Sequence, residues 1–308
     1  MSANTGIEWT DATWNPIAGC SLVSPGCRDC YAMGEAHRLG ERLEQAKYKG
    51  LTKVVNGKPV WTGEVRLWEK ALHDPLRWRK PRRIFVNSMS DLFHDGVSDE
   101  AIDRIFAVMA LAPQHTFQVL TKRPERMRGY VSSQQVQDRI KAAMWTISGG
   151  RTEHFHGGWP LPNVWLGVSV EDQRRADERI PLLLDTPAAV RWVSAEPLLG
   201  PVDLRSYLTG AEEPNSAGEA IGWRPPLDWV VAGGEFGPDA QPMHPDWARS
   251  LRDQCAGAGV AFLFKQWGEH HPTAEYRDGK LFMARVGKKA AGRTLDGRTH
   301  DEYPQVRT

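Results

Sequence analysis

Three of the four cysteines in the chain lie in one short segment, at Cys20, Cys27 and Cys30. Four cysteines are too few for a disulfide-stabilised secreted scaffold in a chain of 308 residues, and clustered thiols more often bind metal or carry out redox chemistry. The spacing C-x6-C-x2-C allows three thiolates of one loop to ligate an iron–sulfur cluster while one iron stays open to another ligand. We therefore expect a cysteine loop over residues 20–30 that binds a metal centre.

Two other assignments remain open for these thiols. A structural zinc ion could bind them with His37 or Cys255 completing the site. Cys27 and Cys30 also form the C-x2-C pattern of a redox pair. Cys255 falls on the apolar stripe of a predicted helix, where a cysteine is usually a small buried side chain.

Short runs of β-branched and aromatic residues alternate with helical patterns, which is typical of a parallel α/β sheet. Six runs are predicted as strands: residues 83–87, 116–120, 163–168, 190–193, 228–232 and 260–264. An earlier strand is predicted around residues 13–16, just before the cysteine loop. The predicted fold class is α/β, a partial parallel (βα) TIM-type barrel of about six or seven strands with loop insertions.

The segments between these strands have helical patterns. Ser98 is a predicted N-cap, and helices are also predicted over residues 171–184 and 245–256. We expect one barrel domain over residues 1–271, which includes the cysteine loop. A C-terminal extension over residues 272–308 is expected to pack on that barrel.

Three stretches are predicted as insertions. Residues 50–63 contain Asn56 and Gly57, a dipeptide that indicates the turn of a β-hairpin. Residues 149–162 are rich in Gly, His and Pro, and residues 210–222 are polar and rich in Glu. Both of these last two stretches are predicted as loops.

Polar or ionisable side chains follow nearly every predicted strand. Ligands of parallel α/β barrels and sheets bind beyond the carboxyl ends of the strands, so we expect these side chains to converge on one opening. The candidates are Ser88, Ser90, Asp91, Lys122, Ser169, Glu171, Glu196, Glu235 and Lys265. Of these, Glu196, Glu235 and Lys265 are the candidate catalytic residues.

Two basic stretches suggest a phosphate-containing partner. Residues 77–83 hold five cations, and Trp78 among them could stack on a base, although a solvated basic turn explains the same pattern. The second stretch comprises Lys122, Arg123, Arg126 and Arg128. A nucleotide or a nucleic acid is therefore one hypothesis for the substrate.

The charge balance and the apolar runs limit the partners to expect. Lys plus Arg number 39 and Asp plus Glu number 38, so the net charge of +1 argues against a polybasic mode of binding. The longest apolar run, residues 105–112, is far shorter than the roughly 20 residues of a spanning helix. No secretory signal is visible at the start of the sequence. We therefore expect a cytoplasmic protein with no membrane partner.

A three-cysteine loop after a first strand, followed by a partial (βα) barrel, resembles the radical S-adenosylmethionine superfamily. More closely, the chain is similar over most of its length to a bacteriophage and bacterial family of unassigned function. The motifs that carry this similarity are TDATWNP at 10–16, SMSDLFH at 88–94, LTKRP at 120–124, WLGVSVE at 165–171, EPLLG at 196–200 and FKQW at 264–267.

The resemblance implies that Cys20, Cys27 and Cys30 ligate three irons of a [4Fe–4S] cluster. The fourth iron would bind the amino and carboxylate groups of S-adenosylmethionine. One electron from an external donor would then split the sulfonium, and the resulting 5′-deoxyadenosyl radical would abstract hydrogen from an unknown substrate. The competing hypotheses are a zinc-stabilised nucleic-acid-binding or adaptor protein, and a barrel whose cluster is structural or transfers electrons.

The resemblance also suggests where the cofactor binds. Ser88-Met89-Ser90-Asp91 replaces the Gly-Gly-Glu that usually follows the second strand and receives the cofactor's amino group. Ser169 and Glu171 lie where the superfamily often contacts the ribose. Lys122 is suited to the carboxylate of S-adenosylmethionine.

Overall fold

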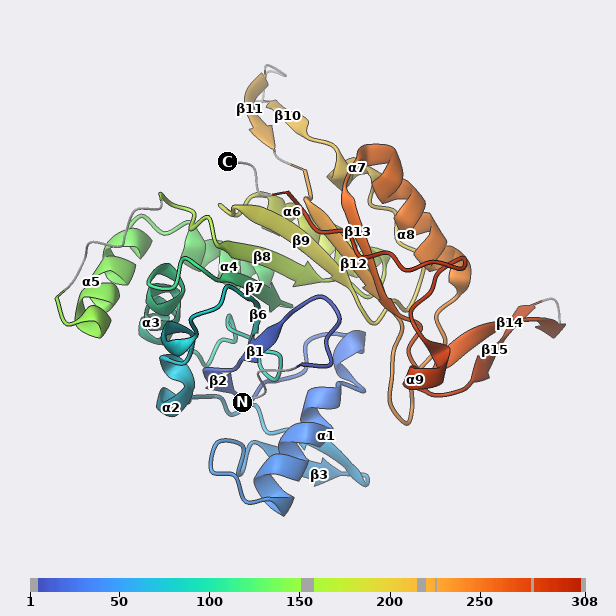
Figure 1. The fold of residues 1–308 in the computed structure, drawn as a ribbon, viewed down its shortest axis with the longest axis horizontal. Helices are drawn as coiled ribbons and strands as arrows, with labels where there is room; N and C mark the ends of the chain where they lie inside the picture. Colours follow the sequence, from blue (N-terminus) through green and yellow to red (C-terminus); the bar gives the residue numbers. More distant parts are fainter. Residues whose placement is uncertain (1–4, 151–157, 215–219, 225, 278–279, 306–308) are drawn as a thin grey trace. The chain divides into compact units, whose positions relative to one another are not determined.

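The computed structural model describes residues 5–150, 158–214, 220–224, 226–277 and 280–305 (Figure 1). Its largest sheet has seven strands in the order β1-β6-β7-β8-β9-β12-β13. These strands are β1 (Ala12–Trp14), β6 (Arg83–Val86), β7 (Thr116–Thr121), β8 (Val164–Ser169), β9 (Val190–Ala195), β12 (Trp229–Gly233) and β13 (Ala261–Gln266).

The seven strands and the helices between them confirm the predicted fold class, a partial parallel (βα) barrel. Each strand overlaps one of the predicted runs. Pairing is parallel from β1 through β6 to β7, and again from β9 through β12 to β13. Every residue of β8 and of β12 is buried. Continuous apolar runs predict such strands because side chains on both faces of the sheet are covered.

The chain divides into two compact units, which are described separately below. The first unit comprises residues 1–167 and 186–189, and the second comprises residues 168–185 and 190–308. The predicted boundary between a barrel and an extension at residue 271 stays a prediction.

The first unit covers its strands with three helices, α3 (Asp99–Ala110), α4 (Pro124–Val131) and α5 (Val136–Ser148). Helix α3 begins where predicted, because the Ser98 hydroxyl accepts a hydrogen bond from the Ala101 amide at 3.2 Å. Its buried face includes Ile102, Ile105 and Phe106. Helix α3 packs against α5 (Figure 1).

The cysteine loop of the first unit lies among short elements. They are β2 (Ile17–Ala18), η1 (Pro25–Cys27), α1 (Tyr31–His37), η2 (Arg38–Arg42), β3 (Thr52–Val55), β4 (Lys58–Trp61), β5 (Arg66–Leu67), α2 (Glu69–Leu72) and η3 (Pro75–Arg77). The predicted hairpin turn is confirmed between β3 and β4, where Asn56 and Gly57 have φ angles of 50° and 77°. Ala32 and Met33 of α1 pack in one apolar cluster with Trp61, and Cys20 and Cys30 border this cluster. The loop is therefore anchored by a small core of its own.

The second unit contains the remaining elements. They are α6 (Gln173–Leu184), α7 (Arg205–Leu208), β10 (Ala211–Pro214), β11 (Ala220–Arg224), α8 (Pro245–Ala258), β14 (His270–Arg277), β15 (Lys280–Arg285) and α9 (Lys288–Ala291). Helix α6 begins two residues later than predicted, because Asp172 is its N-cap and accepts the Arg175 amide at 2.8 Å.

The structure contradicts one of the two predicted loops and describes the other only in part. The loop predicted over residues 210–222 is wrong at both ends, where β10 and β11 form an antiparallel hairpin. Backbone hydrogen bonds between two strands do not require apolar side chains, so the polar composition of this segment is compatible with a hairpin. For the predicted loop over 149–162, residues 151–157 lie outside the described part of the chain.

The last described residues run along β13. The amide of Phe264 donates to the carbonyl of His300 at 3.0 Å, and the amide of Glu302 donates to the carbonyl of Phe262 at 3.3 Å. The indole of Trp229 also donates to the Glu302 carbonyl at 2.9 Å. These bonds use backbone groups that the edge of a sheet otherwise leaves to solvent.

Two loops of the second unit meet backbone to backbone after β12 and β13. The amide of Gly234 donates to the Gln266 carbonyl, and the amide of Glu269 donates to the Glu235 carbonyl, both at 2.9 Å. A Cβ atom on Gly234 would lie 2.0 Å from the carbonyl oxygen of Trp267. Glycine at position 234 is therefore required by the close approach of another backbone.

We expect Gly234→Ala to lower the free energy of unfolding by about 1–3 kcal/mol, the usual cost of forcing an extra carbon into a packed site. Gly257→Ala, on α8, is the matched control, because a Cβ there meets nothing within 4 Å. Alanine in a helix should leave stability unchanged or raise it by about 0.5–1 kcal/mol. Urea unfolding followed by circular dichroism measures both, and equal midpoints for the two variants would contradict the proposed steric clash.

Candidate functional site

The cysteine loop begins at a position that only glycine can occupy. Gly19 has a φ angle of 93°, and a Cβ atom there would lie 2.1 Å from the carbonyl oxygen of Glu64. Gly19 also forms a bridge with Ser90, next to the end of β6. This contact sets the point from which Cys20 enters the loop. Cys27 then ends η1, and Cys30 immediately precedes α1.

The three thiols of the loop are free, and burial makes two of them weak acids. The pKa of Cys20 is raised to about 12, mainly by burial and then by the Asp91 carboxylate, while the Arg123 guanidinium acts in the opposite direction. Burial also raises the pKa of Cys30, against which the charge of Lys122 acts. Cys30 raises the pKa of Cys20, and Cys27 raises that of Cys30, so each of these two thiols is affected by another sulfur of the loop. A cation that binds here must therefore displace protons.

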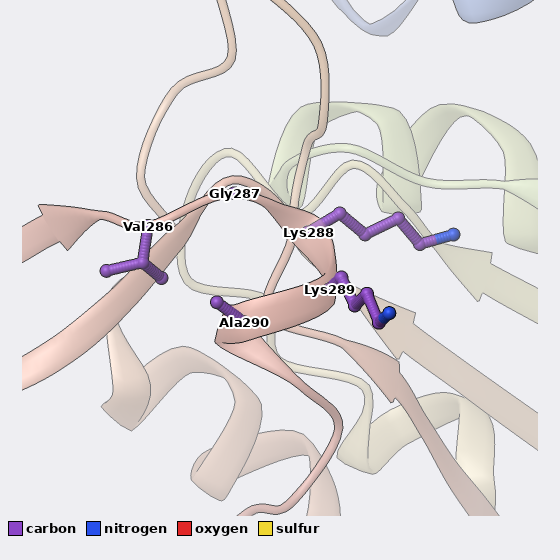
Figure 2. A pocket seen from close by; sticks show the side chains of 5 residues that line it. All are labelled: Val286, Gly287, Lys288, Lys289 and Ala290. Atoms are coloured by element: carbon purple, nitrogen blue, oxygen red, sulfur yellow. The ribbon is translucent and has the colours of Figure 1, made fainter.

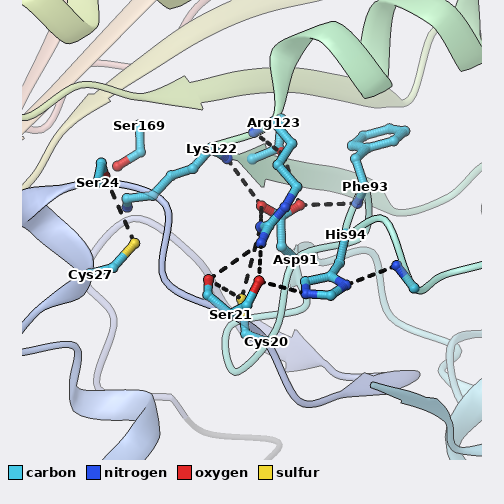
Figure 3. A network of polar contacts seen from close by, with 12 residues as sticks. Cys20, Ser21, Ser24, Cys27, Asp91, Phe93, His94, Lys122, Arg123 and Ser169 are labelled. Atoms are coloured by element: carbon cyan, nitrogen blue, oxygen red, sulfur yellow. Dashed lines mark hydrogen bonds and ion pairs between the residues drawn. The ribbon is translucent and has the colours of Figure 1, made fainter. Parts of the chain in front are cut away.

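Asp91 is the centre of a buried polar network in the first unit (Figure 3). Its carboxylate accepts hydrogen bonds from the Thr121 hydroxyl at 2.7 Å, the Phe93 amide at 3.0 Å and the Lys122 amide at 3.1 Å. The fourth donor is Nη1 of Arg123, at 3.0 Å. The side chains of Asp91 and Arg123 are each only 8% exposed. The network thus joins the segments that follow β6 and β7.

Arg123 connects this network to the cysteine loop. Its Nη2 donates to the Ser21 hydroxyl at 2.8 Å and to the Ser21 carbonyl at 3.3 Å, and its Nη1 lies 4.0 Å from Sγ of Cys20. His94 holds Ser21 from the other side, with Nε2 at 2.8 Å from the hydroxyl oxygen. Because Nδ1 of His94 accepts the Gly96 amide at 3.0 Å, the neutral ring carries its proton on Nε2 and donates it to Ser21.

Ser88 and Ser90 form hydrogen bonds within the protein. The Ser88 hydroxyl donates to Oδ1 of Asn15 at 3.2 Å, and the Ser90 hydroxyl donates to the Ile17 carbonyl at 3.0 Å. The Tyr31 hydroxyl donates to the Ser88 carbonyl at 2.7 Å. Both serines therefore hold the segment after β6 against the segment after β1, and their role toward a cofactor stays a prediction.

Two of the three candidate catalytic residues contact each other in the second unit. Nζ of Lys265 donates to both carboxylate oxygens of Glu196, at 2.7 and 2.8 Å, and Nε2 of Gln266 donates to Oε1 at 3.0 Å. The side chains of Lys265 and Glu196 are 9% and 14% exposed. Glu235, the third candidate, is buried two residues after the end of β12. Its Oε2 accepts a hydrogen bond from the Gln241 amide at 2.9 Å. The ends of β9 and β13 thus form a buried ion pair.

Ser169 is the last residue of β8, Glu171 follows that strand, and both contact Arg179 of helix α6. The Glu171 side chain is fully buried and forms an ion pair with Nη1 of Arg179 at 3.1 Å. The same Nη1 donates to the Ser169 carbonyl at 2.7 Å, and the Ser169 hydroxyl donates to the Glu196 carbonyl at 3.3 Å. The Glu171 carboxylate therefore neutralises Arg179, and its predicted contact with a ribose stays a prediction.

The structure divides the predicted residues between the two units. The three cysteines, Ser88, Ser90, Asp91 and Lys122 belong to the first unit, and Ser169, Glu171, Glu196, Glu235 and Lys265 belong to the second. Convergence of all of them on one opening stays a prediction. Sequence reasoning did not select Ser21, His94 and Gln266, although the motifs 88–94 and 264–267 contain two of them.

A single-metal site receives no support from the geometry. Among the residues that the structure describes, no three His, Cys, Asp or Glu side chains are placed to hold a metal ion. Nδ1 of His37, one candidate to complete a zinc site, lies 3.1 Å from the Thr52 hydroxyl. Cys255, the other candidate, is fully buried in α8, as predicted for a small core side chain.

Several cations of the two basic stretches have partners within the protein. The Arg82 guanidinium lies 5.2 Å from the centre of the Trp78 ring. Arg83 pairs with Asp11 at 2.9 Å, and Arg126 pairs with Asp99. A nucleic-acid partner stays a hypothesis. None of the described helices combines the length and the apolar character needed to cross a membrane.

A surface pocket of about 560 Å³ lies elsewhere in the second unit (Figure 2). It is lined by Val286, Gly287, Lys288, Lys289 and Ala290. These lining residues include none of the predicted site residues. Nζ of Lys288 lies 4.9 Å from the centre of the Phe236 ring, a cation–π contact that positions the start of α9.

Comparison with protein-family models matches residues 4–304 to a family described as "Protein of unknown function (DUF5131)". The chain belongs to this family. No curated protein and no solved structure matches it. Because the description of the DUF5131 family states no activity, the function of this member has to be argued from its own residues.

We expect Asp91→Asn to destabilise the first unit strongly, because it leaves the Arg123 charge buried without a counter-charge. Breaking a buried pair in this way costs about 3–5 kcal/mol. Asp99→Asn is the matched control, because Asp99 pairs with Arg126 at a partly exposed position, where such a pair contributes about 0–1 kcal/mol. Denaturant unfolding at neutral pH compares the two variants, and equal losses of stability would contradict the central role of Asp91.

A second prediction concerns pH. Burial, aided by the Arg123 charge, lowers the pKa of His94 below its ordinary value of 6.5, and the carboxylates of Asp91 and Asp95 oppose this only in part. The unfolded chain therefore binds a proton more readily than the folded one. Stability from neutral His94 should be present above pH 6.5 and be lost as the pH falls through the folded pKa. The difference in unfolding free energy between wild type and His94→Gln, measured across this range, should shrink on acidification, and a constant difference would contradict it.

Proposed function

We propose that this protein is a cytoplasmic iron–sulfur enzyme of the radical S-adenosylmethionine type. In this proposal Cys20, Cys27 and Cys30 ligate a [4Fe–4S] cluster, and S-adenosylmethionine binds at the iron that has no protein ligand. The observation that carries it is the set of three free thiols in one loop, with the Arg123 guanidinium 4.0 Å from Sγ of Cys20.

The chemistry of the donor set fits a multi-iron cluster. Each thiolate of such a cluster binds a different iron, so the sulfurs lie farther apart than the ligands of one ion. The lack of a single-ion group among the described residues is compatible with that spacing. Thiolates that are buried also require positive charge close by, which the irons and Arg123 would both supply.

When bound, the cluster would supply one electron to S-adenosylmethionine and so produce the 5′-deoxyadenosyl radical that abstracts hydrogen from the substrate. The chain's own residues would bind and orient. Lys122, whose charge acts on Cys30, would attract the carboxylate of the cofactor. Asp91 accepts four hydrogen bonds and so holds the end of β7 that carries Lys122 in place.

In this proposal the ion pair of the second unit acts on the substrate. Lys265 and Glu196 form a short, largely buried ion pair, so both groups are held in fixed positions at the ends of β13 and β9. Glu235 is the third candidate, held by the amide of Gln241. The substrate is unidentified; a nucleotide or nucleic acid is the class that the basic stretches suggest.

Anaerobic reconstitution with iron and sulfide tests the proposal. We expect about four irons per chain, and most of this iron should be lost in each single variant Cys20→Ala, Cys27→Ala and Cys30→Ala. Cys255→Ala is the matched control, because Cys255 is fully buried in α8. Metal analysis and electron paramagnetic resonance of the reduced protein provide the measurements.

Other outcomes separate the competing functions. A colourless protein with one zinc per chain would replace the proposal with a zinc-stabilised binding or adaptor protein. Equal loss of iron in Cys255→Ala would show that the ligand set is wrong. A cluster whose paramagnetic signal does not change when S-adenosylmethionine is added would favour a structural or electron-transfer role.

A further inference from the structure

The three proposed ligands of the cluster do not have the same surroundings. The Arg123 guanidinium lies 4.0 Å from Sγ of Cys20. Cys27 instead has the Ser24 hydroxyl at 3.8 Å. A full positive charge is therefore held close to Cys20, whereas the contact of Cys27 is with a neutral hydroxyl.

The guanidinium is held in this position by several bonds (Figure 3). Its Nη1 donates to Asp91 and its Nη2 donates to Ser21, at 3.0 and 2.8 Å. The Ser21 hydroxyl oxygen also accepts the Nε2 proton of His94, which fixes that oxygen from a second direction. With its planar fork bonded on both arms, Arg123 has little freedom to turn away from the sulfur.

The two charges of the ion pair act on Cys20 in opposite directions. Nη1 of Arg123 lies 4.0 Å from Sγ of Cys20 and donates to the Asp91 carboxylate at 3.0 Å, so both charges lie close to this sulfur. Because both side chains are buried, water screens neither effect strongly. Any change of charge at a centre bound through Cys20 would therefore be felt by both members of the pair.

We propose that Asp91 and Arg123 form a positioning pair that sets the reduction potential of the cluster ligated by Cys20. Arg123 raises the potential and Asp91 lowers it, while Ser21 and His94 fix the distance of the guanidinium from the sulfur. Reduction adds one electron to the cluster, so a nearby positive N–H group stabilises the reduced form and a carboxylate destabilises it. This inference rests on the proposed function, because it requires a cluster at the cysteine loop.

Redox titration of the reconstituted protein under anaerobic conditions tests the proposal. Dithionite supplies the single electron that reduces the cluster, and electron paramagnetic resonance reports the reduced fraction. We expect the potential to shift to a more negative value in Arg123→Gln and to a less negative value in Asp91→Asn. Arg126→Gln is the matched control, because Arg126 lies in the first turn of α4, three residues after Arg123, but pairs with the partly exposed Asp99; its potential should match wild type.

The opposite signs separate a charge effect from loss of structure. A pair with only a structural role would loosen the loop in both variants, and both potentials would shift in the same direction. Shifts of the same sign, or no shift in either variant, would therefore overturn the proposal. In Arg123→Gln the buried Asp91 keeps its other three donors, which favours a folded variant.

Ser21→Ala provides a second measurement if a charge variant fails to fold. It keeps both charges and removes only the hydroxyl that orients the guanidinium, so we expect a smaller shift with the sign of Arg123→Gln. A wild-type potential in Ser21→Ala would overturn the proposed role of Ser21 and His94 in orienting the Arg123 guanidinium. Failure of the wild-type protein itself to assemble a cluster would instead refute the proposed function, so the two failures are distinguishable.

Discussion

The buried ion pair between Asp91 and Arg123 is the interaction on which the candidate site depends. Two charges at 8% exposure are stable only when each has an opposite charge and enough hydrogen bonds. That requirement draws in the amides and hydroxyl that surround Asp91 and the serine that follows Cys20. The end of β6, the end of β7 and the cysteine loop are thereby joined through one network.

The second unit places charge at strand ends in the same way. Lys265, near the end of β13, pairs with Glu196, which follows β9, and Glu171, which follows β8, pairs with Arg179. Close backbone contacts at Gly234 and Gly268 fix the adjoining loops, because no Cβ fits between them. Ionisable groups at the carboxyl ends of these strands are therefore held rigidly, which is the condition for precise binding or proton transfer.

The thiols of the cysteine loop, of which Cys27 is buried and Cys20 and Cys30 are half-buried, are the groups that could bind a metal centre. A thiolate in a low-dielectric position is costly unless a cation lies beside it, and burial raises the pKa values of Cys20 and Cys30 accordingly. A metal centre would relieve that cost, and Arg123 would relieve part of it at Cys20. The match to the DUF5131 family covers residues 4–304, but the family description names no activity. The proposed function therefore depends on these residues.

The sequence by itself determined the seven strands of the main sheet, the N-cap at Ser98, the turn at Asn56 and Gly57, and the position of the three cysteines. These features depend on local periodicity, on backbone preferences of single residues and on short spacings, all of which a sequence displays directly. Only the tertiary structure decided that Arg123 pairs with Asp91 and that Ser21, itself bonded to His94, orients the Arg123 guanidinium. The ion pair between Glu171 and Arg179 was likewise visible only in the structure. The pairing of Asp91 with Arg123 joins residues that are distant in the chain, and residue types alone do not specify which charges meet. The hairpin of β10 and β11 was predicted as a loop, because its strands pair through backbone groups and the polarity of their side chains does not indicate that pairing.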